Sequence, residues 1–394
     1  LETGVRAGPM SSGARIYADY NATAPLRAEA KAAIVSALGL TGNPSSVHAE
    51  GRKARALVEG ARETIAAAIG ACRDDIAFTG GGTEAVALAL RGALRAVGNA
   101  KLITSAIEHD AVTTIAGDVS AWPVKPDGVV DLDRLRAEVA AVAGRGERPV
   151  VSLMLVNNET GVIQPVAEAA DIAHKAGGLI HCDAIQALGK IEVSIIDLEV
   201  DYLSLSAHKI GGPHGIGATY VKAGAPFAAV QTGGGQEFGR RAGTENVAGI
   251  AGFAAAVAQA TRGIETYQSL SEHRDRMEEK LKAAAPSLQV HGSGAARVAG
   301  VSCFGVEGLP SETQIMGLDL AGFAVSAGSA CSSGKVKPSR VLTAMGLSDT
   351  AARSAIRASF GWATVWQDFD ALAEAWIKHA ARARPQLVKL DTHV

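Results

Sequence analysis

Between residues 58 and 221 the sequence alternates between short apolar runs and segments with the apolar spacing of amphipathic helices. Such alternation predicts an α/β fold, in which a mostly parallel sheet carries helices on both faces. The run Val150–Val156 is almost entirely apolar, as expected for a strand buried on both faces. The expected strands are Ile76–Thr79, Lys101–Ala106, Val150–Val156, Leu179–Cys182, Tyr202–Leu205 and Ala218–Val221, and the expected helices between them include Val58–Ile69, Thr83–Val97 and Val166–Ala176.

The pattern changes after about residue 262, where strands become sparser and the helices more charged. We therefore expect a large ligand-binding domain over residues 28–262 and a smaller α+β domain formed by residues 11–27 and 263–394. The first ten residues end at Met10, a plausible natural start, and we expect them to be an expression remnant outside the fold. The expected elements of the smaller domain are a helix over Ser269–Ala285, strands over Ala299–Phe304 and Ala355–Phe360, and a helix over Trp366–Ala383.

Composition excludes several classes of protein. Hydrophobic residues make up 47% of the 394 positions, enough for a large core, which excludes wholesale disorder. The 38 Lys and Arg residues nearly balance the 40 Asp and Glu residues, which argues against nucleic-acid or membrane-surface binding driven by net charge. The longest uncharged apolar run, Val247–Ala258, is shorter than the ~20 residues that span a bilayer. Nothing in Leu1–Pro9 resembles a signal peptide, so we expect a cytoplasmic protein.

The four cysteines are far apart, form no C-x-x-C pair and show no zinc spacing, so we expect neither a disulfide framework nor a metal site. Cys331 lies within the small, polar stretch Ser326–Gly334, which suits a nucleophile on a loop that moves. Cys72, Cys182 and Cys303 lie in or beside apolar patterns, and we expect them to be small buried side chains.

A glycine-rich turn, Gly80–Gly82, follows the first expected strand and precedes a helix. Its backbone N–H groups, together with the Thr83 hydroxyl, would suit a phosphate at the helix N-terminus. A plain turn in which Thr83 caps the helix fits the same residues equally well.

Two further clusters follow expected strands, at the sheet edge where open α/β proteins bind ligands. Asp183, at the end of a buried strand, needs a partner such as a protonated pyridine nitrogen or a helix N-terminus. Lys209 stands between an apolar strand and a Gly-Gly turn, where loss of water would lower its pKa, as a Schiff-base lysine requires. Ser206 and His208 flank this lysine and could bind an anion.

Eight strings in this order resemble the cysteine desulfurases, pyridoxal 5′-phosphate enzymes of fold type I in the class-V aminotransferase group. The resemblance runs from Tyr17 to about Gly361, nearly the whole chain, and it implies a mostly parallel seven-stranded sheet. The strings are Tyr17–Pro25, Gly42–His48, Glu108–His109, Asn157–Gly161, His181–Gln186, Ser206–Lys209, Arg241–Asn246 and Ser329–Cys331.

The resemblance implies a role for each residue around the cofactor ring. Lys209 would carry pyridoxal phosphate as a Schiff base and later move the substrate α-proton. Asp183 would keep the pyridine nitrogen protonated, and Gln186 would bind the ring hydroxyl. His109 would stack on the ring and assist proton transfer.

The resemblance also implies how the cofactor phosphate is held. Gly82, Thr83, Ser206 and His208 would bind it from one subunit. Thr244 would reach the same phosphate from the partner subunit, which makes the enzyme an obligatory homodimer with shared active sites.

On the substrate side, the resemblance assigns Asn158 and Arg357 to binding L-cysteine, with Arg357 pairing with the carboxylate. The alternating strand around Arg357 is also compatible with a surface position. Cys331 would attack the substrate sulfur as a thiolate, keep it as a persulfide and release alanine. The persulfide would pass to an acceptor such as an iron–sulfur scaffold protein.

The sequence departs from the family pattern at a few positions outside these roles, among them Ala85–Ala87 and Arg340, where His or Tyr is common. Two other functions stay open at this point. One is a sister activity on the same fold, such as selenocysteine lyase, aminotransferase or epimerase activity. The other is an inactive scaffold role in iron–sulfur assembly.

Overall fold

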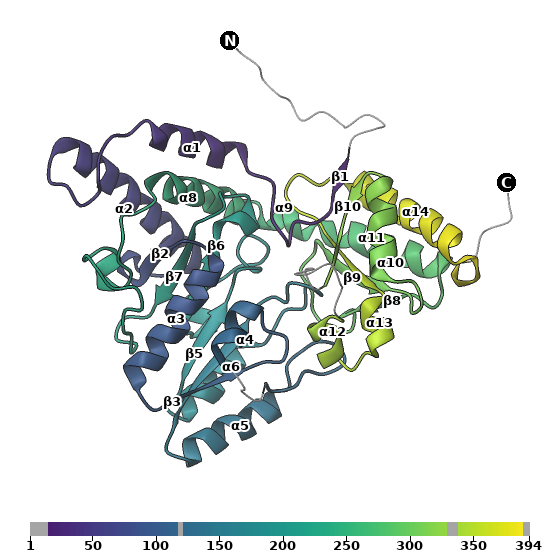
Figure 1. Ribbon diagram of the computed structural model, residues 1–394, viewed down its shortest axis with the longest axis horizontal. Helices are drawn as coiled ribbons and strands as arrows, with labels where there is room; N and C mark the ends of the chain where they lie inside the picture. The colour runs from purple at the N-terminus through teal and green to yellow at the C-terminus, as the bar shows by residue number, and fades with distance from the viewer. Residues whose placement is uncertain (1–14, 117–120, 329–337, 389–394) are drawn as a thin grey trace, which may run out of the picture.

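The computed structural model describes residues 15–116, 121–328 and 338–388. Its larger part, on the left of Figure 1, is built on a six-stranded sheet in the order β2-β7-β6-β5-β4-β3. Strands β3 to β6 are parallel to one another, and β7 is antiparallel to both of its neighbours. The strands are β2 (Ile76–Thr79), β3 (Ala100–Thr104), β4 (Arg148–Met154), β5 (Leu179–Asp183), β6 (Tyr202–Ser206) and β7 (Gly217–Val221).

Alternate residues of these strands enter two separate apolar layers, as the pleat of a strand requires. Val150 and Leu179 pack in one layer with residues of α3 (Gly82–Val97) and α4 (Asp110–Ala116). Their neighbours Val151 and Ile180 belong to the other layer, which contains the remaining helices of this part. Those helices are α1 (Ala28–Leu38), α2 (Ala49–Ile69), α5 (Leu132–Gly144), α6 (Val166–Lys175), α7 (Ile195–Leu198) and α8 (Val247–Arg262).

The second part, on the right of Figure 1, is an antiparallel sheet in the order β11-β12-β9-β8 with helices beside it. The N-terminal strand β1 (Ile16–Tyr17) pairs in parallel with β10 (Phe323–Ala324), which ties the start of the described chain to this part. The remaining elements are β8 (Gln289–His291), β9 (Val301–Gly305), β11 (Ser326–Ala327), β12 (Ala355–Ser359), α9 (Ile264–Gln268), α10 (Leu270–Ala284), α11 (Ser311–Leu320), α12 (Arg340–Ala344), α13 (Asp349–Arg353) and α14 (Trp366–Ala383).

The predicted α/β fold is confirmed, and each of the six strands expected before residue 221 ends within two residues of its predicted bounds. The helix expected over Val58–Ile69 begins earlier, at Ala49, because the His48 side chain accepts a hydrogen bond from Gly51 N and caps it there. The first turns of this helix are polar, so the apolar periodicity did not reveal where the helix begins.

The prediction of seven strands is wrong, because the large sheet has six strands within the described residues. Beyond β3, Trp122 forms only an isolated parallel bridge with Ser105. The bridge consists of two hydrogen bonds, from Trp122 N to the Thr104 carbonyl and from Ala106 N to the Trp122 carbonyl, and Val124 next forms a bridge with Val130 instead. The pairing therefore ends after one residue.

Two of the cysteine predictions are confirmed, since Cys182 and Cys303 are buried. Cys72 is exposed, contrary to the prediction. Helix α2 ends at Gly70 in a left-handed conformation, and the chain then leaves the core to enter the exposed 3₁₀ turn Arg73–Asp75. Cys331 lies outside the described residues, as do residues 1–14.

Among residues 15–116, 121–328 and 338–388, no single helix is both long and apolar enough to cross a membrane. The bent pair of α8 with the following segment Ile264–Ala284 meets that length and composition only when its two parts are joined across a 62° bend.

Candidate active site

A cavity of about 850 Å³ lies at the carboxyl ends of the parallel strands, between the two sheets. Its wall includes Ser326, Ala327 and Gly328 on one side of the segment that carries Cys331, and Pro338 on the other. The sequence-predicted site residues on this wall are Gly82, Thr83, His109, Asn158, Asp183, Gln186, Ser206, His208, Lys209 and Arg357.

One end of the cavity is a polar cradle at the N-terminus of α3. A Cβ atom added to Gly82 would lie 2.5 Å from Ile185 Cδ1 and 3.1 Å from Ser206 Cβ, so any other residue there would require the Ile185 side chain to move. Within the described part of the chain, the buried Ser206 Oγ has no hydrogen-bond partner. Burial lowers the pKa of His208 to about 4, so its ring is neutral at pH 7. This end offers neutral donors and helix N–H groups, which suit a phosphate.

The turn that forms this cradle is fixed by Glu84. Glu84 Oε2 accepts a hydrogen bond from Gly80 N at 2.7 Å, and Glu84 Oε1 accepts one from Arg241 Nε at 2.7 Å. The second contact brings the Arg241–Asn246 string to the turn. Thr244, in that string, is exposed and does not line the cavity of its own chain.

Asp183 is the last residue of β5 and is buried. Its Oδ1 accepts a hydrogen bond from Ile185 N at 3.0 Å. Burial raises the pKa of Asp183, and the hydrogen bond from Ile185 N opposes this rise, as does the nearby Lys209. A cationic ring nitrogen placed beside this carboxyl group would stabilise its ionised form.

Lys209 lies in the 3₁₀ turn Ala207–Ile210, directly after β6. Its Nζ donates hydrogen bonds to the carbonyl oxygens of Asn21 at 2.7 Å and Ala22 at 2.9 Å. Burial, and then the nearby charge of Arg357, lowers the pKa of Lys209 to about 8. A fraction of this amine is therefore neutral and nucleophilic near neutral pH.

Gln186 belongs to a network that sequence reasoning missed. Its Nε2 donates to the Asn21 carbonyl at 2.9 Å, and its Oε1 accepts from Lys190 Nζ at 2.6 Å. Lys190 also donates to Asn21 Oδ1 at 2.6 Å. The available signal was a lysine at the end of the apolar run Ala187–Gly189, four residues after Gln186.

Arg357, on β12, is buried, so the surface interpretation of this residue is wrong. Its Nη2 donates to Asp19 Oδ1 at 2.7 Å and its Nη1 to the Asn158 carbonyl at 3.0 Å. Its Nε has no partner within the described residues. Asp19, which the sequence did not single out, accepts a second hydrogen bond from Ser326 Oγ at 2.8 Å.

His109 and Glu108 follow β3 and both line the cavity. His109 Nδ1 accepts a hydrogen bond from Ala111 N at 3.1 Å. Glu108 is buried, and its Oε1 accepts hydrogen bonds from Ser105 Oγ at 2.6 Å and Met154 N at 2.9 Å. Burial nevertheless raises the pKa of Glu108 to about 8, so this carboxyl group is mostly protonated at pH 7.

Two further side chains connect the wall to the residues beside the Cys331 segment. The buried Glu159 Oε2 accepts a hydrogen bond from Ser339 Oγ, and a Cβ added to Gly328 would lie 2.0 Å from the same oxygen. Arg340, the departure from the family pattern, pairs with Asp110 Oδ1 at 3.0 Å. The residues on both sides of the Cys331 segment therefore contact side chains of the cavity wall.

The class-V aminotransferase family model matches residues 16–372 of this chain. A cysteine desulfurase from Cereibacter sphaeroides is 40% identical over 371 residues, which cover 91% of this chain and 94% of that protein. The chain belongs to the class-V aminotransferase family, with the cysteine desulfurases.

Solved structures of this family have the same fold. The NifS-like protein from Rickettsia africae ESF-5 superposes with a TM-score of 0.84 at 32% identity, and the match covers 93% of this chain and 99% of that one. A structure described as SspA in complex with cysteine superposes with a TM-score of 0.75 at 30% identity, covering 88% and 98% of the two chains. The predicted fold class and family resemblance are confirmed.

Membership in this family implies pyridoxal phosphate as the cofactor, and the cavity residues fit it. Within the described residues, three buried polar atoms on the wall have no partner, namely Ser206 Oγ, Glu108 Oε2 and Arg357 Nε. A buried polar atom without a partner costs about 1–3 kcal/mol, so a polar ligand that pairs with such atoms gains affinity.

Proposed function

We propose that this chain is a pyridoxal-phosphate-dependent L-cysteine desulfurase that transfers the substrate sulfur to Cys331 and releases alanine. One observation carries the proposal. A half-buried lysine with a pKa of about 8 shares one cavity with the carboxyl group of Asp183, the guanidinium of Arg357 and both flanks of the Cys331 segment.

Lys209 is the residue that would bind the cofactor covalently, because its neutral amine can condense with the aldehyde and release water. Asp183 would pair with the ring nitrogen and Gln186 with the ring hydroxyl, while His109 would stack on the ring. Gly82, Thr83, Ser206 and His208 would hold the phosphate. When bound, pyridoxal phosphate supplies an electron sink for negative charge at the substrate α-carbon.

The chain's own groups would handle the proton and the substrate. Lys209 Nζ would take the proton from the α-carbon, since its pKa of about 8 leaves the amine partly neutral. Arg357 would pair with the substrate carboxylate through its unpartnered Nε and Nη2, with Nη2 shared with Asp19. Asn158 lies beside this guanidinium and would help to position the substrate.

In the sulfur step, the Cys331 thiolate would attack the substrate sulfur. A sulfur–sulfur bond forms as the carbon–sulfur bond breaks, and its electron pair stays on the departing carbon, which is protonated to give alanine. The position of Gly328 and Pro338 on the cavity wall supports the assignment of Cys331 to this step. The persulfide would then pass to an acceptor such as an iron–sulfur scaffold protein.

The proposal includes the assembly. Thr244 is exposed and Arg241 is anchored beside the phosphate cradle, which supports a homodimer in which Thr244 completes the partner's site. We also propose a large domain over 28–262, a small domain from 11–27 and 263–394 that carries Cys331, and a cytoplasmic location.

The test is product analysis with the purified holoenzyme. L-cysteine should give equal amounts of alanine and transferred sulfur. Turnover of L-selenocysteine with none of L-cysteine would instead assign the chain to a sister activity. A protein that takes up no pyridoxal phosphate would restore the scaffold interpretation.

A further inference from the structure

Lys190 is a buried lysine immediately behind the cofactor site, with only 5% of its surface exposed. Among the ion pairs of the described residues none includes Lys190. Its Nζ instead contacts two amide oxygens, Asn21 Oδ1 and Gln186 Oε1, both at 2.6 Å. Burial lowers the pKa of Lys190, and the charges of Lys209 and Arg357 lower it further.

A buried cation without an anion is costly, so the fold keeps this lysine at the expense of stability. Both of its contacts belong to residues that line the active-site cavity, while Lys190 itself does not. The lysine therefore reaches the site only through Asn21 and Gln186.

The contacts determine which way the Gln186 amide faces. Lys190 Nζ has at least two N–H groups in either protonation state and donates one of them to the Gln186 oxygen. The Gln186 nitrogen is then the atom left to donate, and one of its two hydrogens already binds the Asn21 carbonyl. The second hydrogen remains available for a ligand.

The same contacts also reach the end of the Lys209 side chain. The Asn21 carbonyl accepts hydrogen bonds from both Gln186 Nε2 at 2.9 Å and Lys209 Nζ at 2.7 Å. Lys190 holds the side chain of this same Asn21. One asparagine thus connects Lys190, Gln186 and Lys209.

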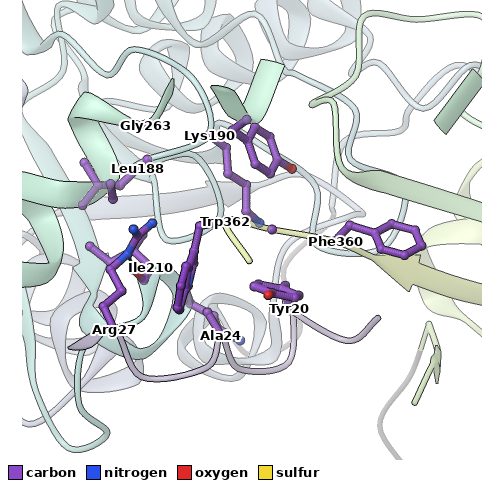
Figure 2. Close-up of a pocket in the computed structure, with 14 residues that line it drawn as sticks. Tyr20, Ala24, Arg27, Leu188, Lys190, Ile210, Gly263, Phe360 and Trp362 are labelled. Atoms are coloured by element: carbon purple, nitrogen blue, oxygen red, sulfur yellow. Dashed lines mark hydrogen bonds between the residues drawn. The ribbon is translucent and has the colours of Figure 1, made fainter. Parts of the chain in front are cut away.

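A second, small cavity of about 30 Å³ has Lys190 in its wall (Figure 2). Lys190 and Lys209 both line it, together with Tyr20, Arg27 and Trp362. This volume has room for one or two water molecules. Water there would hydrate the ammonium group and reduce the cost of its burial.

We propose that Lys190 is a positioning residue that orients the Gln186 amide to donate to the ring hydroxyl of pyridoxal phosphate. The inference rests on the proposed cofactor, and it deepens that proposal by assigning a role to a residue that does not touch the ring. If Lys190 acts in this way, its effect on cofactor binding depends both on the ring hydroxyl and on Gln186.

The test measures equilibrium binding of two compounds to the full-length apoprotein, pyridoxal 5′-phosphate and its 3-deoxy analogue, which lacks the ring hydroxyl. The variant Lys190→Met removes the terminal nitrogen and keeps an unbranched side chain that is one atom shorter. We expect it to weaken pyridoxal phosphate binding at least tenfold and to change binding of the 3-deoxy analogue less than twofold. Gln186→Leu should show the same selectivity, and the double variant should lose no more than Gln186→Leu alone.

Equal losses for the two compounds in Lys190→Met would overturn the inference, because the residue would then support the site only structurally. Losses that multiply in the double variant would overturn it as well. If Lys190→Met does not fold, Lys190→Gln retains an amide donor, and we expect an intermediate loss that is again confined to pyridoxal phosphate. Wild-type apoprotein that binds neither compound would overturn the proposed function, and this inference with it.

Discussion

The two walls of the active-site cavity are built in different ways. On the cofactor wall, Asp183 is the last residue of strand β5, and Lys209 lies in the turn directly after strand β6. On the substrate wall, Arg357 is held by Asp19, 338 residues away, and Ser339 by Glu159, 180 residues away. The backbone of the cofactor wall is therefore placed by local turns, although Lys209 Nζ also contacts the Asn21 carbonyl, 188 residues away. The substrate wall exists only when distant segments meet.

This difference predicts different kinds of damage. Changes to the cofactor wall should affect chemistry or cofactor binding, and changes to the substrate wall should affect substrate affinity or the approach of Cys331. The following variants test that separation.

The largest effect is expected for Lys209→Ala on the cofactor wall. Loss of the amine removes both the covalent attachment and the proton acceptor, so kcat for alanine formation should fall by roughly 10⁴-fold. Lys222→Ala is the matched control, since Lys222 is half-exposed and lies outside the cavity, and its activity should stay within twofold of wild type. Activity of Lys209→Ala above one hundredth of wild type, on the order of the smallest general-base effects, would contradict the assignment.

Glu108→Gln, also on the cofactor wall, should change the pH dependence of stability. The pKa of Glu108 is raised by folding to about 8, so the folded state binds a proton that the unfolded chain releases near its ordinary value. Wild-type stability should therefore fall as the pH rises from about 4.5 to about 8, with a loss on the order of 5 kcal/mol from this group. Gln mimics the protonated form, so urea unfolding of the variant should show a flatter decline and higher stability at pH 8. A variant whose pH profile matches wild type would contradict the burial argument.

Arg357→Gln should damage the substrate wall. Loss of one charged hydrogen bond of about 1.5–3 kcal/mol predicts an increase in KM for L-cysteine of roughly 10- to 100-fold, with kcat changed far less. Steady-state kinetics with saturating pyridoxal phosphate provide the measurement. Asp19→Asn serves as the comparison, because it keeps Arg357 and removes only the negative charge of the carboxylate that binds its guanidinium. A fall in kcat at constant KM for Arg357→Gln would place the residue in the chemistry instead.

The smallest effect is expected for Glu159→Gln beside the Cys331 segment. Weakening one hydrogen bond of about 1 kcal/mol to Ser339 should slow sulfur transfer to Cys331 about fivefold and leave cofactor affinity unchanged. Single-turnover kinetics and cofactor titration measure the two quantities. Ser339→Ala should have the same effect, and the double variant should be no slower than either single variant. Multiplied losses would show that the two residues act separately.

The comparison of the two walls also explains what the sequence could predict. The turn Gly80–Gly82, Asp183 and Lys209 each stand in a local pattern at or after a strand end, and the structure brings Gly82, Asp183 and Lys209 to one cavity as expected. The fold class followed from the β/α alternation for the same local reason.

The contacts that the sequence did not reveal are those between distant segments. Neither Asp19 nor Glu159 is marked by periodicity, because their partners lie far away in the chain. Lys190 did carry a local signal, a lysine after an apolar run, but its contacts with Asn21 depend on the tertiary fold. Cys72 was predicted wrongly because it follows the apolar end of helix α2 in the sequence, while the chain turns outward at Gly70.

The central claim, that Cys331 receives the sulfur, can be tested directly by peptide mass spectrometry of the holoenzyme after one turnover with L-cysteine. The account predicts one added sulfur atom on Cys331 in the wild type. It also predicts no added sulfur on any cysteine of the Cys331→Ser variant, which should still bind pyridoxal phosphate. Added sulfur on the exposed Cys72 instead, or unchanged sulfur transfer by Cys331→Ser, would contradict the claim.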